Sequence, residues 1–287
     1  MAQGEVTGIF QYLKYGTGAS ADTATGIIDG GDLNINPDTR VRLGIGGTEI
    51  RRGGLIVPAG SASMYVTATN QALCEYAQRA SYPRGALTEL EFEGGADEWE
   101  IKYHDCVLTD LSVDYAQGEG LKATITWGSY DLPDEGTTGG TQAAESALDF
   151  EDYEFVITFE GVEYGVSAAS LALTNNVTFK GAADTKLATE KRFPTHYVYG
   201  LEELTLGITC DRPLPAATLG LYDDVMPEDL GVILIGSNGT NTLTLTLINL
   251  IGADPLSFGF VDSNTPVEWS YGFRGKSATG SLTWGWG

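Results

Sequence analysis

The stretch "LTELEFEGG" at residues 87–95 alternates apolar and acidic side chains, a pattern typical of a β-strand with one buried face. Leu90 and Phe92 are expected on one side of a sheet, and Glu89, Glu91 and Glu93 on the other. Short alternating runs of Thr, Val, Leu and Tyr recur along the 287 residues, and 38 glycines supply turns between them. The sequence therefore predicts an all-β protein.

The composition limits what the chain can bind. Its 39 acidic and 16 basic residues give a formal net charge of −23. Nucleic-acid phosphates and anionic membranes would repel such a chain, so adhesion to either is not expected. Acidity also keeps a protein soluble, including in high salt, so the charge alone identifies no partner.

Cysteine use and the N-terminal sequence predict synthesis in a reducing cytosol. Cys74, Cys106 and Cys210 form no C-x-x-C motif and cannot all pair within one chain, so no disulfide framework is expected. The first residues, "MAQGEVTGIFQYLKYG", lack a basic start followed by an apolar run, so we expect no signal peptide. No apolar stretch is long enough to predict a transmembrane helix.

The second half of the chain repeats the apolar pattern of the first. Four segments align in order: 60–69 with 200–209, 98–107 with 242–251, 111–115 with 256–260, and 121–127 with 267–273. A period of this length is too long for a solenoid unit and fits a domain. We therefore predict two copies of one domain, at 1–132 and 153–287, joined by a Gly-, Thr- and acid-rich linker at 133–152.

Each predicted copy is a small antiparallel sandwich or barrel with one short helix. The expected order is a strand, a long excursion, a second strand, a helical piece, a hairpin and two closing strands. The excursions, called arms below, are residues 37–58 and 175–197. The helical pieces are 70–80, where Leu73, Tyr76 and Ala77 would share a face, and more weakly 216–225.

The two arms concentrate the positive charge of the chain. Eight of the sixteen basic residues lie at 39–54 and 175–192, against only Glu49, Asp184 and Glu190. The eight are Arg40, Arg42, Arg51, Arg52, Lys180, Lys186, Lys191 and Arg192. One such hairpin is usually only a solvated loop. Two at matching positions predict arms that dock on acidic surface of a neighbouring subunit.

The sequence contains no catalytic constellation, so we expect no enzyme activity, no cofactor and no metal. His104, Asp105 and Cys106 are adjacent, but neighbours on a strand face opposite sides and cannot form a nucleophile triad. Phosphate-loop and zinc-ligand spacings are missing. The acidic residues around the 89–100 hairpin are interpreted as the surface of a channel or of a rim. They are Glu89, Glu91, Glu93, Glu98 and Glu100.

The order of elements and a set of loose motifs resemble a known family. In the second copy these motifs are "ASLALTNNVTF" (169–179) and "FPTHYVYGLEELTLGITCD" (193–211); in the first they are "GDLNINPDTRV" (31–41) and "LIVPAGSASMYVTATN" (55–70). Over most of residues 30–130 and 155–275 the chain resembles the major tail tube proteins of long-tailed, siphovirus-like bacterial and archaeal viruses, in a tandem duplicated form.

The resemblance implies a structural protein of the virion, made in the host cytoplasm. Family members form rings that stack through their arms into a helical tube, the conduit for DNA ejection. A duplicated chain would form a homotrimeric ring with pseudo-six-fold symmetry. DNA would pass through the lumen without specific binding, and further partners would be the tape measure, tail terminator and distal tail or baseplate proteins.

Other functions stay open at the level of sequence. A monomeric β-sandwich binding module, for a carbohydrate or a receptor, would also be all-β. The same fold is used by neck and baseplate hub proteins and by the inner tube of contractile devices. Charged alternate positions speak against an outer-membrane-type barrel. The 89–100 hairpin is rich in Glu and its counterpart in Thr, so the sequence leaves open which sheet face would line a channel.

Overall fold

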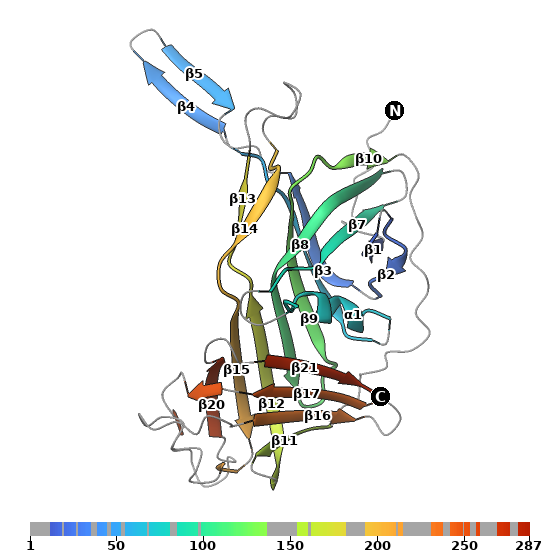
Figure 1. The fold of residues 1–287 in the computed structure, drawn as a ribbon, viewed down its shortest axis with the longest axis vertical. Coiled ribbons are helices and arrows are strands. Elements are labelled where there is room, and N and C mark those ends of the chain that lie inside the picture. Colours follow the sequence, from blue (N-terminus) through green and yellow to red (C-terminus); the bar gives the residue numbers. More distant parts are fainter. Residues whose placement is uncertain are drawn as a thin grey trace.

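The structure is built almost entirely from antiparallel strands, which confirms the predicted all-β class (Figure 1). The computed structural model describes residues 12–18, 20–26, 28–35, 39–44, 47–52, 55–67, 69–80, 85–96, 99–136, 154–159, 162–181, 193–210, 212–214, 231–237, 242–248, 250–252, 257–258, 269–275 and 281–287. Within these ranges there is one α-helix, α1 (Gln71–Tyr76).

One long antiparallel sheet runs through both halves of the chain. Its strands lie side by side in the order β3 (Ile28–Ile35), β6 (Pro58–Tyr65), β9 (Lys122–Ser129), β8 (Trp99–Ala116), β12 (Val162–Thr174), β15 (Glu203–Cys210) and β20 (Trp269–Gly275). Beyond β20 lie the short strands β18 (Leu250–Gly252) and β19 (Ser257–Phe258). We call this sheet the continuous sheet.

Two smaller groups of strands flank the continuous sheet. The first contains β1 (Tyr12–Gly16), β2 (Thr23–Ala24), β7 (Glu89–Ala96) and β10 (Asp134–Gly136), paired around the first part of β8. The second contains β11 (Glu154–Phe159), β16 (Gly231–Ser237), β17 (Thr242–Ile248) and β21 (Ser281–Trp286), attached to the first part of β12. The long strands β8 and β12 therefore take part in both layers.

The same pairing pattern occurs in each half of the chain. The ladder β3–β6–β9–β8 matches the ladder β12–β15–β20 with β18 and β19, and β1–β7–β8 matches β11–β16–β17. Trp127 lies opposite Gly60, and Phe273 opposite Leu206. If Trp127 corresponds to Phe273, as the alignment of 121–127 with 267–273 predicts, this pairing matches Gly60 with Leu206. The alignment of 60–69 with 200–209 instead matches Gly60 with Gly200, so the two predicted alignments differ by six residues.

The two halves meet at a strand seam. Residues Asp110–Ala116 of β8 pair residue for residue with Ala168–Thr174 of β12. Asp114 and Ser170 are partners in this seam, and the Ser170 hydroxyl donates a 2.6 Å hydrogen bond to the Asp114 carboxylate. Backbone hydrogen bonds across a ladder make this a direct continuation of the sheet rather than a contact between separate sheets.

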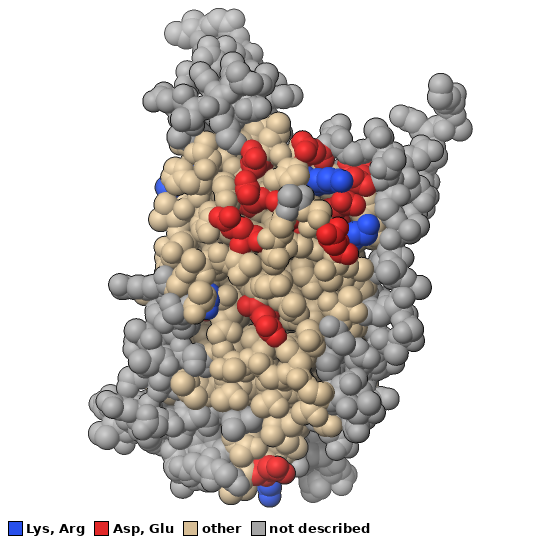
Figure 2. Space-filling model, turned by 45° about the vertical axis from the view of Figure 1, so that its right-hand side comes forward, with Lys and Arg blue, Asp and Glu red and all other residues tan. Residues whose placement is uncertain are grey.

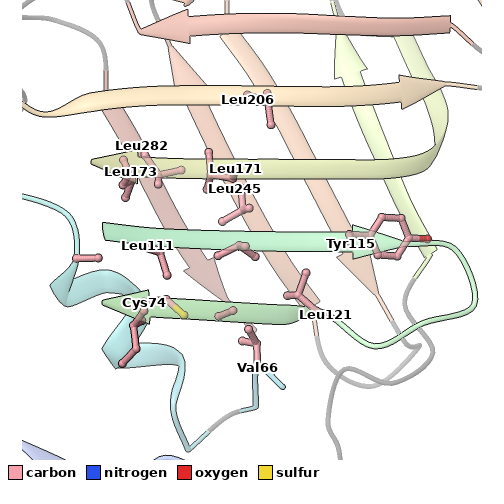
Figure 3. Close-up of a cluster of buried hydrophobic side chains, with 14 of the residues drawn as sticks. Val66, Cys74, Leu111, Tyr115, Leu121, Leu171, Leu173, Leu206, Leu245 and Leu282 are labelled. Carbon is pink, nitrogen blue, oxygen red and sulfur yellow. The ribbon is translucent and has the colours of Figure 1, made fainter. Parts of the chain in front are cut away.

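The core forms one cluster that includes side chains from both halves. Strands β6, β15 and β17 alternate buried and part-exposed positions, as strands with one face in a core do. Figure 3 shows Leu111 and Leu171 from the two sides of the seam together with Leu245 and Leu282 from the flanking strands. Leu90 and Phe92 are each 1 % exposed, which confirms their predicted orientation.

The helix is shorter than the predicted 70–80, although its inward face is as expected. Leu73 and Ala77 are fully buried and Tyr76 packs against the core. The chain enters α1 at Asn70, whose side-chain oxygen accepts a hydrogen bond from the Thr67 backbone N–H and whose amide donates to the carbonyl of Tyr65. The second predicted helical piece, 216–225, lies outside the described residues.

Each arm contains a two-stranded hairpin: β4–β5 projects from the upper end of the body, and β13–β14 runs along the first half toward the same end (Figure 1). β4 (Thr39–Gly44) pairs with β5 (Gly47–Arg52), and β13 (Val177–Lys180) pairs with β14 (His196–Tyr199). The first hairpin is inserted between β3 and β6, and the second between β12 and β15. A side chain at Gly181, beyond the end of β13, would lie 2.7 Å from Leu55 Cδ1, so the base of the first arm is adjacent to the far end of β13.

Candidate functional surfaces

Three surfaces stand out once the fold is known. The first is the solvent-facing side of the continuous sheet, called the open face. The second is an acidic patch on the flanking strands β1, β7, β8 and β10. The third is the pair of arms. The acidic patch and the arms follow positions predicted from the sequence, whereas the open face was not predicted.

The open face is dominated by small hydroxyl side chains. These residues alternate with the core-facing ones on each strand. Its described members are Asp32, Asn34, Ser61, Ser63, Tyr65, Asp110, Ser112, Asp114, Lys122, Thr124, Thr126, Ser170, Ala172, Thr174, Glu203, Thr205, Thr209, Ser270 and Arg274. Hydroxyls bond across the strands, with 3.0 Å between Ser63 and Thr124 and 3.2 Å between Thr209 and Ser270. The open face is therefore polar, and most of its side chains are short.

The open face is weakly acidic and hollowed. The acidic side chains in that set are Asp32, Asp110, Asp114 and Glu203, and the basic ones are Lys122 and Arg274. A shallow pocket on this face is lined by residues from both halves, including Asp114, Lys122, Ser170, Thr209 and Ser270. A sheet face with more acidic than basic side chains and few large side chains would offer an anionic polymer few favourable contacts.

The acidic patch covers the outer side of β7 and β8, facing away from the core. Figure 2 shows carboxylates gathered in the upper part of one face, with a few basic side chains among them. Lys102 reaches Glu93 at 3.3 Å and Glu100 at 3.2 Å, and Lys14 approaches Glu93 at 3.8 Å. Part of the negative charge in this patch is therefore neutralised within the chain.

His104 lies between two carboxylates of the acidic patch. Its Nδ1 is 2.5 Å from Glu91 Oε2, and its Nε2 is 3.0 Å from Asp134 Oδ2 on β10. Burial alone would lower the pKa of His104, but the hydrogen bonds to Asp134 and Glu91 raise it above its ordinary value. The histidine thus links β10 to β7 through hydrogen bonds of its two ring nitrogens to Asp134 and Glu91.

The predicted acidic residues divide between surface and interior. Glu89 is exposed and accepts a 2.8 Å hydrogen bond from the Tyr130 hydroxyl, while Glu91 and Glu93 are partly buried in the ion pairs above. Glu100 is only 4 % exposed and accepts a hydrogen bond from Tyr12. It therefore contributes no accessible carboxylate, contrary to the expectation of a channel or rim residue. Glu98 lies outside the described residues.

Five of the eight basic residues predicted on the arms lie in parts of the arms that the structure describes. Arg40 and Arg42 lie on β4, Arg51 and Arg52 on β5, and the backbone register sets Arg40 opposite Arg51. Lys180 is exposed on β13. Lys186, Lys191 and Arg192 lie outside the described residues.

A buried polar node ties the second arm to α1, and sequence reasoning did not find it. Arg79, 2 % exposed, donates from Nη1 to the Gly200 carbonyl at 2.6 Å and lies 4.7 Å over the Tyr199 ring. Asn175 accepts from Arg79 and donates to backbone carbonyls of the first half. Asn175 precedes β13, so the node fixes where the second arm begins.

The structure gives no support for a catalytic role of the His104–Cys106 segment. Cys106 is fully buried, and burial raises its pKa well above the ordinary thiol value, so its thiol is a poor nucleophile. Among the described residues, no group of three or more His, Cys, Asp and Glu side chains is placed to hold a metal ion. In the same residues, no helix is both long and apolar enough to cross a membrane.

Comparison with known proteins adds no further identification. No protein-family model matches the sequence, and a search of curated proteins gives no significant match.

Proposed function

We propose that this protein is a structural subunit of a viral tail tube, in which copies close into rings and the rings stack through the arms. The observation that carries the proposal is the placement of the two arms. Each is inserted between corresponding strands of its half; the first hairpin projects from one end of the body, and the second runs along the body toward that end. A subunit whose described arms are directed toward one end is suited to head-to-tail stacking, the geometry that makes open filaments.

The recurrent strand pairing supports the second part of the proposal, a tandem duplicated tail-tube domain. If both halves are copies, three chains would supply six equivalent wall segments and six arms. The shared core and the β8–β12 seam would then hold two of the six segments in fixed relation.

The distribution of charge supports different roles for the three surfaces. The open face, with its hydroxyl cover and net negative balance, is proposed to line the channel, where like charge would let DNA slide without adhering. The acidic patch lies on strands that flank the continuous sheet, so it belongs to the rim or the outer wall. The basic arms would bind acidic surface of the next ring, and salt would weaken that contact.

Electron microscopy of the purified protein, across a range of concentrations and salt, tests this proposal. We expect rings with a central hole and tubes of three-fold symmetry. The double variant Arg51→Glu, Arg52→Glu should give shorter tubes or isolated rings, because it reverses the charge of β5. The matched control is the single variant Arg212→Glu, compared with the single variant Arg51→Glu, because it changes the net charge equally at an exposed position off the arms.

Two results would contradict the proposal. Tubes of unchanged length from the arm variant would remove the role given to the arms. A chain that stays monomeric under every condition would favour the monomeric binding module instead.

A further inference from the structure

The β13–β14 hairpin begins after Asn175 and ends before Gly200, and one guanidinium group holds both positions. Arg79 donates from Nε to Asn175 Oδ1 at 2.9 Å and from Nη1 to the Gly200 carbonyl at 2.6 Å. Its Nη2 also donates to the Asn175 carbonyl. Because Arg79 follows α1 and is only 2 % exposed, it fastens both ends of the hairpin to the first half at a buried site.

The two ends of the hairpin also bond to each other where they leave the body. The Gly200 N–H donates to the Asn176 carbonyl at 2.9 Å, and Asn176 Nδ2 donates to the Leu201 carbonyl at 2.8 Å. Asn176 has a φ of 49°, a left-handed conformation that few residue types adopt readily. We call Asn175, Asn176, Gly200 and Leu201 the base of the second arm. The direction of the hairpin is set at this base.

Beyond the base, the hairpin lies against the first half through aromatic side chains. A side chain at Gly128 of β9 would be 2.4 Å from the Phe179 ring, and the Tyr197 ring lies 5.4 Å from the Tyr130 ring. On the other side of the hairpin Val198 is 52 % exposed. The hairpin therefore rests on the body along one side, and its base supplies buried hydrogen bonds.

Glu202 places a buried carboxyl group beside this base. It lies two residues after Gly200 and is 2 % exposed, and among the described residues neither of its oxygens has a hydrogen-bond partner. Burial raises its pKa to about 7, with Arg79 opposing the shift. The protonated carboxyl group fits this site, whereas the carboxylate would be a buried charge without hydrogen bonds.

The charged and titratable groups of this cluster come from three places in the chain. Arg79 follows α1, and Tyr197 and Tyr199 on β14 interact with its charge. Burial raises the pKa of Tyr197, so its phenol stays neutral where Glu202 ionises. The next residue, Glu203, is exposed at the start of β15. Ionisation of Glu202 therefore changes the net charge around Arg79 near neutral pH.

We propose that Arg79 and Glu202 form a proton-controlled latch at the base of the second arm. While Glu202 is protonated, Arg79 holds Asn175 and Gly200, and the hairpin stays seated on the first half. When Glu202 ionises, its carboxylate competes with the Gly200 carbonyl for the guanidinium group, and the base opens. The latch lies within one chain, so the inference requires neither rings nor a tail.

Hydrogen exchange followed by mass spectrometry tests the latch in peptides that cover 175–180 and 196–201. Wild type and Glu202→Gln, whose side chain stays neutral, are compared at the same pH, so the effect of pH on intrinsic exchange cancels. The ratio of the wild-type rate to the variant rate should rise about tenfold or more between about pH 5.5 and pH 8. The matched control is Glu203→Gln, which removes the same charge at the exposed neighbour and should show a constant ratio.

A low concentration of urea separates opening of the base from unfolding of the whole chain. Local opening exposes little surface, so urea that accelerates exchange in β3 and β6 should leave exchange at the base unchanged. Arg79→Lys keeps the charge but lacks the planar fork, so its base should exchange faster than that of the wild type at both pH values.

Three results would overturn the latch. They are a wild-type to Glu202→Gln ratio that does not change with pH, an equal rise for Glu203→Gln, and base exchange that follows β3 and β6 in its urea dependence. Unchanged protection of the base in Arg79→Lys would also contradict it. Because exchange is measured within one chain, failure of the latch and failure of tube assembly are separate outcomes.

Discussion

Arg79 and Asn175 stand 96 residues apart in the chain and form a buried pair, in which Arg79 Nε donates a 2.9 Å hydrogen bond to Asn175 Oδ1. Asn175 Nδ2 in turn donates to the carbonyls of Ala77 at 2.8 Å and Leu108 at 3.0 Å. A single amide thus contacts the chain after α1, strand β8 and the guanidinium. The pair joins the two halves at the base of the second arm.

Replacing Arg79 by Ala should destabilise the protein by about 3 kcal/mol, because it leaves buried carbonyl and amide oxygens without donors. Urea unfolding measures the loss. Arg212→Ala is the control, since Arg212 is exposed and its removal should change stability by about 0.5 kcal/mol or less. Equal effects of the two substitutions would show that the node contributes no more than a surface contact.

Glu202 should make stability fall as the pH rises. Burial raises its pKa to about 7, with Arg79 opposing the shift. From about pH 4.5 to the folded pKa, the folded state binds more protons than the unfolded state, so the free energy of unfolding decreases.

The variant Glu202→Gln removes this dependence. It should match the wild type near pH 4.5 and exceed it above the folded pKa by about 3 kcal/mol at most. Urea unfolding at both ends of this range provides the measurement. Parallel pH profiles of the two proteins would show that the carboxyl is not held protonated by the fold.

His104 should stabilise the protein in its charged form, whereas Glu202 destabilises it in its charged form. Its raised pKa means that the contribution is fully present below about pH 6.5 and is lost as the pH rises through the folded pKa. His104→Gln should therefore destabilise the protein more in mildly acidic than in alkaline solution.

Nuclear magnetic resonance gives a direct measurement of this pKa. The chain has two histidines, so His196→Gln assigns the His104 signal. Asp134→Asn should lower the pKa of His104, since it removes one of the two carboxylates. A pKa unchanged by this substitution would show that the contact with β10 carries no charge coupling.

Gly60 should not tolerate even a methyl group. A Cβ at this position would lie 2.2 Å from the Trp127 ring, and that ring is 1 % exposed and stacked at 4.2 Å on Phe92. Gly60→Ala should cost about 2 kcal/mol through overpacking, measured by urea unfolding.

Gly207→Ala is the matched control for Gly60. It lies on β15, the corresponding strand, and its nearest neighbour would be 3.9 Å from the new Cβ. A change of about 0.5 kcal/mol or less is expected there. If both glycines respond alike, the contact with Trp127 is not the reason.

Much of the local structure could be predicted because it depends on neighbouring residues. The alternation in "LTELEFEGG" is a local pattern, and it correctly predicts Leu90 and Phe92 as buried. The two basic excursions are visible as composition, and their described parts form hairpins. Periodicity indicates which side chains share a face, and it can be recognised within a single short stretch of sequence.

What could not be predicted depends on pairing between distant strands. Alternation is the same in every register, so sequence alignment alone cannot decide whether the counterpart of Gly60 is Gly200 or Leu206. Strand pairing places Gly60 opposite Trp127 and Leu206 opposite Phe273, which favours Leu206 if these two aromatic residues are counterparts. Glu100 reads as another surface carboxylate, and only the approach of Tyr12 and Lys102 accounts for its burial. The open face is spread over seven strands of both halves, and no single stretch reveals it.

Because β8 pairs with β12, the two halves are held together by noncovalent contacts as well as by the peptide chain that links them. Hydrogen bonds from Asp110–Ala116 to Ala168–Thr174, the Arg79–Asn175 pair and a common core all cross from one half to the other without using it. A chain divided between Gly136 and Glu154 would therefore be a two-piece protein rather than two proteins. The fragments, expressed together, should associate and co-purify, because the contacts that hold the two halves together are strand pairing, buried hydrogen bonds and core packing.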